Sequence, residues 1–204
     1  MIILPDDSYN LHAAVALAAR NRGIPTLCVQ HGNISSMNVA FIRPNADWHV
    51  VWGSQCKKAL LAEYPTITPG SVVSLGRAQR VSEDYDRSLA RAKMNIPQDA
   101  RVAVFFSVGG PMSLTEMERG RLYERLIEAF MQTAVLLIIK PHPSQDMRYP
   151  QAVTAACSPD KCRCMTKASA RMLISAADVV ISHAHTSMHL EAMAIGRPLI
   201  YLED

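Results

Sequence analysis

The feature that most constrains this chain is the regular alternation of short apolar segments with segments of helical periodicity. Apolar or β-branched runs predict strands at residues 1–4, 26–30, 49–52, 72–75, 101–107, 135–139, 163–165, 178–182 and 199–202. Helical spacing predicts helices within 8–23, 54–64, 115–131, 168–177 and 187–195, with Ser8 and Ser54 as capping residues. Ser113 with Glu116 and Thr115 with Glu118 both fit a capping box at the start of the third of these helices. Strands that alternate with helices indicate βαβ units and a largely parallel sheet.

A polar segment divides this pattern into two. Residues 77–100 are rich in charged side chains, so we interpret them as a partly helical crossover with few core contacts. The predicted fold is therefore α/β, with two Rossmann-like lobes at 1–76 and 101–204 and mostly parallel sheets. The first lobe has about three clear strands and the chain ends directly after a strand, whereas doubly wound sheets normally have about five or six. We expect an incomplete first lobe and a truncated second one.

Composition narrows the function classes. A formal net charge of +3 and 6% aromatic residues argue against a nucleic-acid partner. The sequence contains no apolar stretch of the ~20 residues that span a bilayer. Five cysteines without a secretory signal favour reduced thiols in a cytoplasmic protein. Cys157, Cys162 and Cys164 lack the paired CxxC spacing of a zinc site, so no metal site is predicted there.

Histidines and glycines stand at the predicted carboxyl ends of several strands. His31-Gly32 follows 26–30, and a histidine in this position is either a general base or a hydrogen-bonded turn residue. Lys140 and His142 alternate with prolines after 135–139, in a stiff extended segment that suits a phosphate or is simply a strand terminator. Gly109-Gly110 follows 101–107, where a glycine pair would permit a diphosphate to approach.

The densest group of polar residues joins the strand 178–182 to the last helix. His185, Thr186 and Ser187 lie where that helix begins, and the free N–H groups of a helix start attract anions. Glu191, one turn further on, does not fit a capping box, and a carboxylate there could accept both hydroxyls of a ribose. Asp6 and Asp7 follow the first strand, and we favour a turn and helix cap for them.

Together these segments resemble the GT-B glycosyltransferase superfamily. The likeness rests on Asp6 before a helix that leads to Val29-Gln30-His31-Gly32, on Val51-Trp52-Gly53 with Ser74-Leu75-Gly76-Arg77, on Lys140-Pro141-His142-Pro143, and on 178–198 with its Glu-Ala-Met and Gly-x-Pro. It is most similar to bacterial surface-polysaccharide transferases, including the CDP-glycerol glycerophosphotransferases.

The resemblance implies transfer of a sugar or polyol phosphate from a nucleotide-activated donor to a polysaccharide or lipid-linked acceptor. His31 would deprotonate the acceptor, which the first lobe would bind. His142 and Lys140 would stabilise the leaving nucleotide, and Gly109, Gly110, His185, Thr186 and Ser187 would bind phosphate, with Glu191 on the ribose. Such enzymes need no cofactor or essential metal. The resemblance implies a cytoplasmic enzyme and is compatible with peripheral association at the inner face of the membrane.

Two other functions stay open. UDP-N-acetylglucosamine 2-epimerases share the fold and a strand-end histidine. They usually show a Gly-Gly turn with paired glutamates where this chain has Thr186-Ser187 and Glu191, and a His-x-Glu-Ala-Gly motif where it has Gln30-His31-Gly32-Asn33. These differences favour a transferase. The third reading is an inactive nucleotide-binding module.

Overall fold

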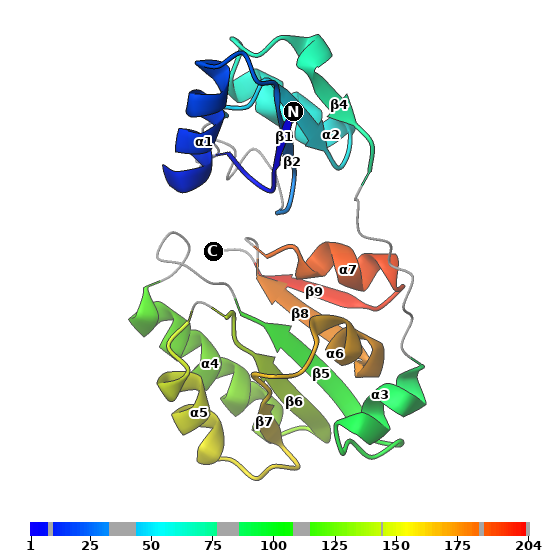
Figure 1. The fold of residues 1–204 in the computed structure, drawn as a ribbon. Helices are drawn as coiled ribbons and strands as arrows, with labels where there is room; N and C mark the ends of the chain where they lie inside the picture. Colours follow the sequence, from blue (N-terminus) through cyan, green and yellow to red (C-terminus); the bar gives the residue numbers. More distant parts are fainter. Residues whose placement is uncertain are drawn as a thin grey trace. The chain divides into compact units, whose positions relative to one another are not determined.

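The computed structural model describes residues 1–7, 10–32, 44–76, 86–107, 115–143, 145–183 and 186–202. The chain divides into two compact units, residues 1–80 and 81–204, each with its own parallel sheet (Figure 1). The predicted α/β class with two Rossmann-like lobes is confirmed. Within the described residues, no helix combines the length and the apolar character needed to cross a bilayer.

The first unit is built on a parallel sheet in the order β1-β2-β3-β4. Its elements are β1 (Ile2–Leu4), α1 (Asn10–Arg20), β2 (Thr26–Val29), β3 (Trp48–Val51), α2 (Ser54–Glu63), a 3₁₀ turn (Pro69–Ser71) and β4 (Val72–Ser74). The register aligns Leu4 with Cys28 and Cys28 with His49, and His49 with Val72, so these side chains form one row across the buried face. These four strands match the apolar runs at 1–4, 26–30, 49–52 and 72–75 to within a residue at each end.

One face of this sheet is well buried and the other is not. Val51 and Val72 pack against Leu60 of α2 on the buried face. Ile3 and Trp48 lie in register with Leu27 on the opposite face, where they are 62% and 47% exposed. The small core follows from the short strands, which have few positions to bury.

The second unit has a sheet in the order β7-β6-β5-β8-β9, again parallel throughout. Its elements are α3 (Arg87–Lys93), β5 (Arg101–Phe106), α4 (Glu116–Met131), β6 (Val135–Lys140), α5 (Arg148–Ala155), β7 (Cys162–Cys164), α6 (Ala170–Ala176), β8 (Val179–His183), α7 (Met188–Ala194) and β9 (Leu199–Leu202).

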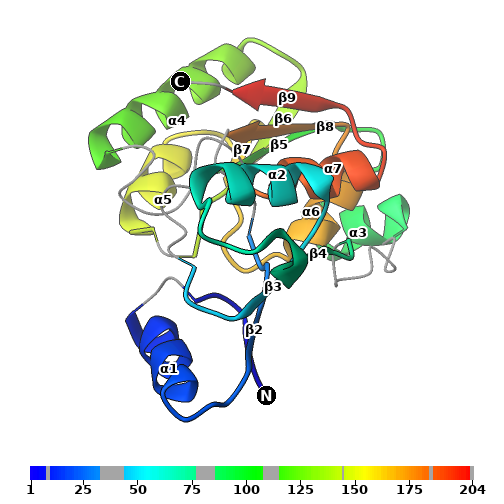
Figure 2. The same ribbon diagram turned by 90° about the horizontal axis from the view of Figure 1, so that it is seen from above.

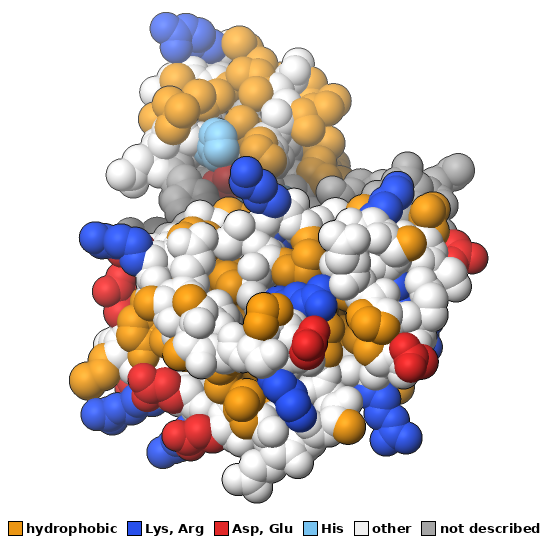
Figure 3. Space-filling model, turned by 90° about the horizontal axis from the view of Figure 1, so that it is seen from below, with side chains coloured by type: hydrophobic (Ala, Val, Ile, Leu, Met, Phe, Trp, Pro, Cys, Tyr) orange, Lys and Arg blue, Asp and Glu red, His pale blue; other side chains and the backbone are white. Residues whose placement is uncertain are grey.

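Both faces of the second sheet are covered, as the continuous apolar strands predicted. Val102 and Val104 of β5 face a core shared with α3, α6 and α7, whereas Ala103 and Phe105 face α4 (Figure 2). On the face seen in Figure 3, the described basic and acidic side chains are interspersed and do not gather into a patch of one sign.

Three local predictions need correction. Residues 87–96 are not a core-poor linker, because Ala90, Met94 and Ile96 are buried in the second core. Helix α5 was not predicted: its Pro150 occupies the first turn, where a missing N–H costs no helical hydrogen bond. Gly53, not Ser54, is the N-cap of α2. The capping box of Thr115 and Glu118 at α4 is confirmed.

Candidate functional site

The strand order of the second unit reverses between β5 and β8. The chain moves from β5 outward through β6 to β7, then returns to place β8 and β9 on the other side of β5. Ligands of open parallel sheets bind outside the carboxyl ends of the strands at such a reversal. Ser107 and His183, at the ends of β5 and β8, are both buried there. The segments that follow contain the predicted Gly109, Gly110 and His185, which lie outside the described residues.

Lys140 and His142 lie at the carboxyl end of β6, next to β5. The Ser107 N–H donates to the Lys140 carbonyl over 3.1 Å, which joins the two strand ends. The Lys140 ammonium donates to the Thr166 carbonyl, and burial lowers the pKa of this ammonium. Burial and the positive charge of Arg119 lower the pKa of His142, which disfavours the charged form of its ring. Lys140, rather than His142, thus supplies positive charge at this strand end.

A closed polar network fixes the segment that carries His142. The Tyr123 hydroxyl donates to Ser107 Oγ over 2.8 Å, and Gln145 Nε2 donates to the same oxygen over 2.8 Å. Gln145 Oε1 accepts the His142 N–H over 2.9 Å. Tyr123, Ser107 and Gln145 are buried, so the hydrogen bonds among these three side chains are made away from water. No local sequence pattern distinguishes Gln145 or Tyr123, since their meeting depends on the packing of α4 against the sheet.

Thr186 and Ser187 precede α7, as predicted. Thr186 Oγ1 accepts the Met188 N–H over 3.3 Å, whereas the Ser187 side chain makes no capping hydrogen bond. Both residues are half-buried and follow β8, whose neighbour in the sheet is β5. The topology thus brings Thr186, Ser187, Lys140 and His142 to the same edge of one sheet.

Glu191 lies in the first turn of α7 and is buried. Its Oε2 is 3.7 Å from the Nε of Arg171 on α6. The positive charge of Arg171 thus compensates the negative charge of the buried carboxylate. No local sequence pattern predicts this ion pair. The predicted contact with a ribose stays a prediction, and it would require the carboxylate to serve Arg171 and the ribose together.

His31 follows β2 in the first unit and is exposed. Its Nδ1 is 2.8 Å from the Pro5 carbonyl oxygen. Because a carbonyl only accepts, Nδ1 must carry the proton of this contact. In the neutral ring the lone pair then lies on Nε2, so the contact fixes the tautomer that a general base requires.

The turn after β2 is held by the side chain of Gln30. Gln30 Nε2 donates to the Gly32 carbonyl over 2.7 Å, and Oε1 accepts the Trp52 N–H over 2.6 Å. Gln30 thereby ties the turn to the end of β3. The buried side chain of Gln30 is a supporting residue that its sequence position alone did not identify.

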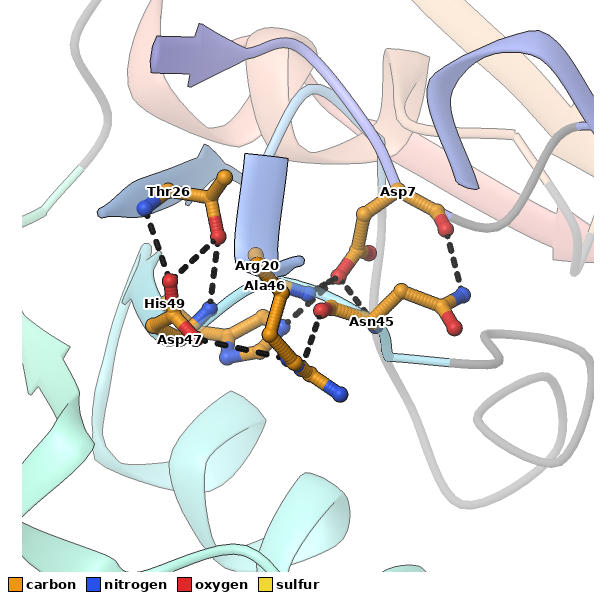
Figure 4. A network of polar contacts seen from close by, with 7 residues as sticks. All are labelled: Asp7, Arg20, Thr26, Asn45, Ala46, Asp47 and His49. Carbon is orange, nitrogen blue, oxygen red and sulfur yellow. Dashed lines mark hydrogen bonds and ion pairs between the residues drawn. The ribbon is translucent and has the colours of Figure 1, made fainter. Parts of the chain in front are cut away.

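Asp6 and Asp7 have separate partners. Asp6 Oδ2 is 2.7 Å from Nδ1 of His12 on α1. Asp7 is 1% exposed and holds the chain before β3, because its Oδ2 accepts the N–H groups of Asn45 and Ala46 (Figure 4). Asp7 is therefore more than the turn and capping residue that was predicted, because it joins segments almost forty residues apart.

No model of a known protein family matches the sequence, and no curated protein matches it. Solved structures do match. UDP-GlcNAc 2-epimerase from Neisseria meningitidis bound to UDP-GlcNAc gives a TM-score of 0.68 at 16% identity, over 94% of this chain and 56% of that one. The S. aureus MnaA-UDP co-structure gives 0.68 at 15% identity, over 100% and 57%. The glycosyltransferase from Rickettsia africae ESF-5 gives 0.56 at 15% identity, over 95% and 55%.

These likenesses establish the fold, which is of the GT-B type. The chain spans just over half the length of these three proteins. Several of the similar structures are UDP-GlcNAc 2-epimerases, so the finer resemblance to CDP-glycerol transferases stays a prediction.

Proposed function

We propose that this chain is the nucleotide-sugar-binding part of an enzyme that acts on a UDP-activated sugar. The observation that carries the proposal is the strand reversal between β5 and β8, where Lys140, Thr186 and Ser187 share one sheet edge. An ammonium and two hydroxyls suit the charge and the oxygens of a diphosphate. The similar structures from Neisseria meningitidis and S. aureus contain UDP-GlcNAc and UDP, which supports uridine as the base.

The first candidate reaction is epimerisation of the sugar at C2. It is supported by the several UDP-GlcNAc 2-epimerases among the similar structures. In this reaction His31 would exchange a proton with the sugar through Nε2, because its Nδ1 is occupied by the Pro5 carbonyl. Lys140 would stabilise the diphosphate.

The second candidate is glycosyl transfer, in which His31 would deprotonate an acceptor hydroxyl. Thr186-Ser187 and the single Glu191 favour it, because they replace the glycine turn and paired glutamates usual in the epimerases. The similarity to a Rickettsia glycosyltransferase also supports it.

A thermal-shift panel of UDP, CDP, GDP and CMP tests the binding step, since a ligand of the native state raises the melting temperature by mass action. UDP should give the largest shift, and Lys140→Ala should reduce it. Lys161→Ala is the matched control, because the Lys161 ammonium donates to the Thr133 carbonyl well away from the strand ends that carry the site. Equal shifts for all four nucleotides, or none, would refute the proposal.

Incubation of the protein with UDP-GlcNAc in deuterated water distinguishes the two reactions. Incorporation of deuterium at C2 without an acceptor indicates epimerisation. Release of UDP only when an acceptor is added indicates transfer. Binding without either reaction would select the nucleotide-binding module.

A further inference from the structure

Asp7, Cys28 and His49 form a buried cluster on the first sheet. Cys28 and His49 are register partners on neighbouring strands, and Asp7 follows β1, the strand on the other side of Cys28. One ligand atom from each residue lies within 4.8 Å of the other two. The three residues are 1%, 8% and 5% exposed, in that order. In the part of the chain that the structure describes, this is the one such group of three histidine, cysteine or carboxylate side chains.

The two oxygens of the Asp7 carboxylate differ in their hydrogen bonds. Oδ2 accepts the N–H groups of Asn45 and Ala46 over 2.6 and 2.7 Å, and lies 3.0 Å from Nε2 of His49 (Figure 4). Oδ1 is also buried, and it makes no hydrogen bond of normal geometry to the described residues. The Cys28 thiol, a weak donor, interacts with the Asp7 carboxylate, whose charge adds to burial in raising the pKa of that thiol. A buried carboxylate oxygen with no stronger described donor than a thiol is poorly satisfied, so it needs an explanation. An ion beside Oδ1 would provide one.

We propose that Asp7, Cys28 and His49 bind a zinc ion. Thiolate sulfur, imidazole nitrogen and carboxylate oxygen are the ligands that zinc takes in proteins, whereas thiolate does not suit magnesium or calcium. Zinc bond lengths of about 2.0–2.3 Å put the ligand atoms of a tetrahedral site roughly 3.5 Å apart. The ligand atoms already lie within 4.8 Å of one another, so they would have to move closer by up to about 1.3 Å to reach that geometry.

The charges of this site balance. Zinc binding would release the proton of the Cys28 thiol to solvent. The resulting thiolate, the carboxylate and a neutral imidazole would then offset the two charges of the ion, which matters where water is excluded. The fourth position would hold water or a backbone oxygen. Since Cys28 and His49 lie on β2 and β3 and Asp7 lies in the segment after β1, the ion would hold the first sheet together and stabilise this unit rather than take part in the reaction.

The test is a cobalt and zinc titration of the purified full chain after treatment with a chelator. One equivalent of Co²⁺ should produce a thiolate-to-metal absorption band. One equivalent of Zn²⁺ should displace it and raise the melting temperature. Cys28→Ser should lose the band, whereas Cys56→Ser, which changes a half-buried cysteine of the same unit outside the cluster, should keep it.

X-ray absorption of the wild-type zinc complex decides the question even if the Cys28 variant does not fold. One sulfur with nitrogen and oxygen ligands is expected. The proposal is overturned if wild type gives no band, if Cys28→Ser keeps it, or if the zinc has two or three sulfur ligands, which would assign the metal to Cys157, Cys162 and Cys164. None of these readouts depends on nucleotide-sugar binding, so this proposal and the proposed function can fail separately.

Discussion

At the scale of single residues, two of the side chains proposed for the reaction and for nucleotide binding already have one polar atom in contact with another residue of the protein. The Pro5 carbonyl fixes one nitrogen of His31, and Arg171 lies beside the Glu191 carboxylate. A held ring or carboxylate loses little entropy when a ligand binds, which favours a geometry prepared in advance. The consequences can be tested one residue at a time.

His31→Ala should reduce the rate of turnover of the nucleotide sugar by a factor of about 10²–10⁴, the usual contribution of a general base. Binding of UDP should be almost unchanged, because the residues proposed for the nucleotide lie in the other unit. Steady-state kinetics and calorimetric binding of UDP to the same preparation measure both. Equal loss of binding and turnover would show that His31 has a structural role.

Gln145→Leu should lower the free energy of unfolding by about 1–3 kcal/mol, because it leaves the buried hydroxyls of Ser107 and Tyr123 and the His142 N–H without their amide partner. Urea unfolding measures this change. Gln151→Leu, at an exposed position on α5, is the control and should have little effect. A Gln145 variant as stable as wild type would mean that water replaces the amide.

At the scale of elements, one ion-pair network attaches α3 to the second sheet. The buried Arg91 donates to the Ala176 carbonyl over 3.1 Å and to Asp178 Oδ2 over 2.9 Å. The same carboxylate oxygen accepts the Val102 N–H of β5 over 2.8 Å, and Arg87 donates to the other oxygen. This network explains why a segment with so many charged residues belongs to the core.

Asp178→Ala should lower the free energy of unfolding by about 2–3 kcal/mol, since it removes the carboxylate opposite a buried guanidinium. The value is at the low end for a buried pair because the Asp178 side chain is 37% exposed and Arg91 keeps its carbonyl partners. The control is Asp146→Ala, whose partner Arg148 is exposed, and it should change stability little. Similar effects of both substitutions would contradict a special role for Arg91.

The same carboxylate predicts a pH dependence. Burial tends to raise the pKa of Asp178, but the Val102 N–H and the two arginines outweigh it, so the pKa lies below its ordinary value. A group with a lowered folded pKa contributes stability above its unfolded pKa of about 3.9 and loses it as the pH falls through the folded value. Urea unfolding from neutral pH to about pH 3 should therefore show a smaller acid loss in Asp178→Asn than in wild type. Parallel curves would exclude this linkage.

At the scale of the whole molecule, the two units differ in the core that each can build. The first has a small cluster around Val51, Leu60 and Val72, and it leaves Ile3 and Trp48 partly exposed. The second has an apolar layer on each face of its sheet. Hydrophobic burial is the main favourable contribution to folding, so the first unit should be the less stable one.

Urea should unfold the first unit before the second. Both tryptophans of the chain, Trp48 and Trp52, lie in the first unit, so tryptophan fluorescence reports on it alone, whereas circular dichroism reports mainly on the helices of both. The fluorescence midpoint should fall at a lower urea concentration than the dichroism midpoint. Zinc should raise the fluorescence midpoint if the cluster at Asp7 binds it. Coincident transitions would show that the units unfold as one.

Much of the architecture follows from local patterns. Continuous apolar runs such as 135–139 indicate parallel strands buried on both faces, and Thr115 with Glu118 marks the start of α4 through a hydrogen-bonding pattern only three residues long. These signals are readable because each depends on neighbours in the chain. Helix α5 was not predicted, because a proline such as Pro150 indicates the end of a helix unless its position in the first turn is known.

The sequence by itself determined the alternation of strands and helices, their parallel arrangement and the positions of polar residues at strand ends, since these are set by periodicity and by local backbone chemistry. Only the tertiary structure decided which distant side chains meet. Asp7 with Cys28 and His49, Gln145 with Ser107, and Arg91 with Asp178 are joined by strand order and helix packing. Contacts between residues far apart in the chain depend on how whole elements bury their apolar faces, and no local pattern contains that information.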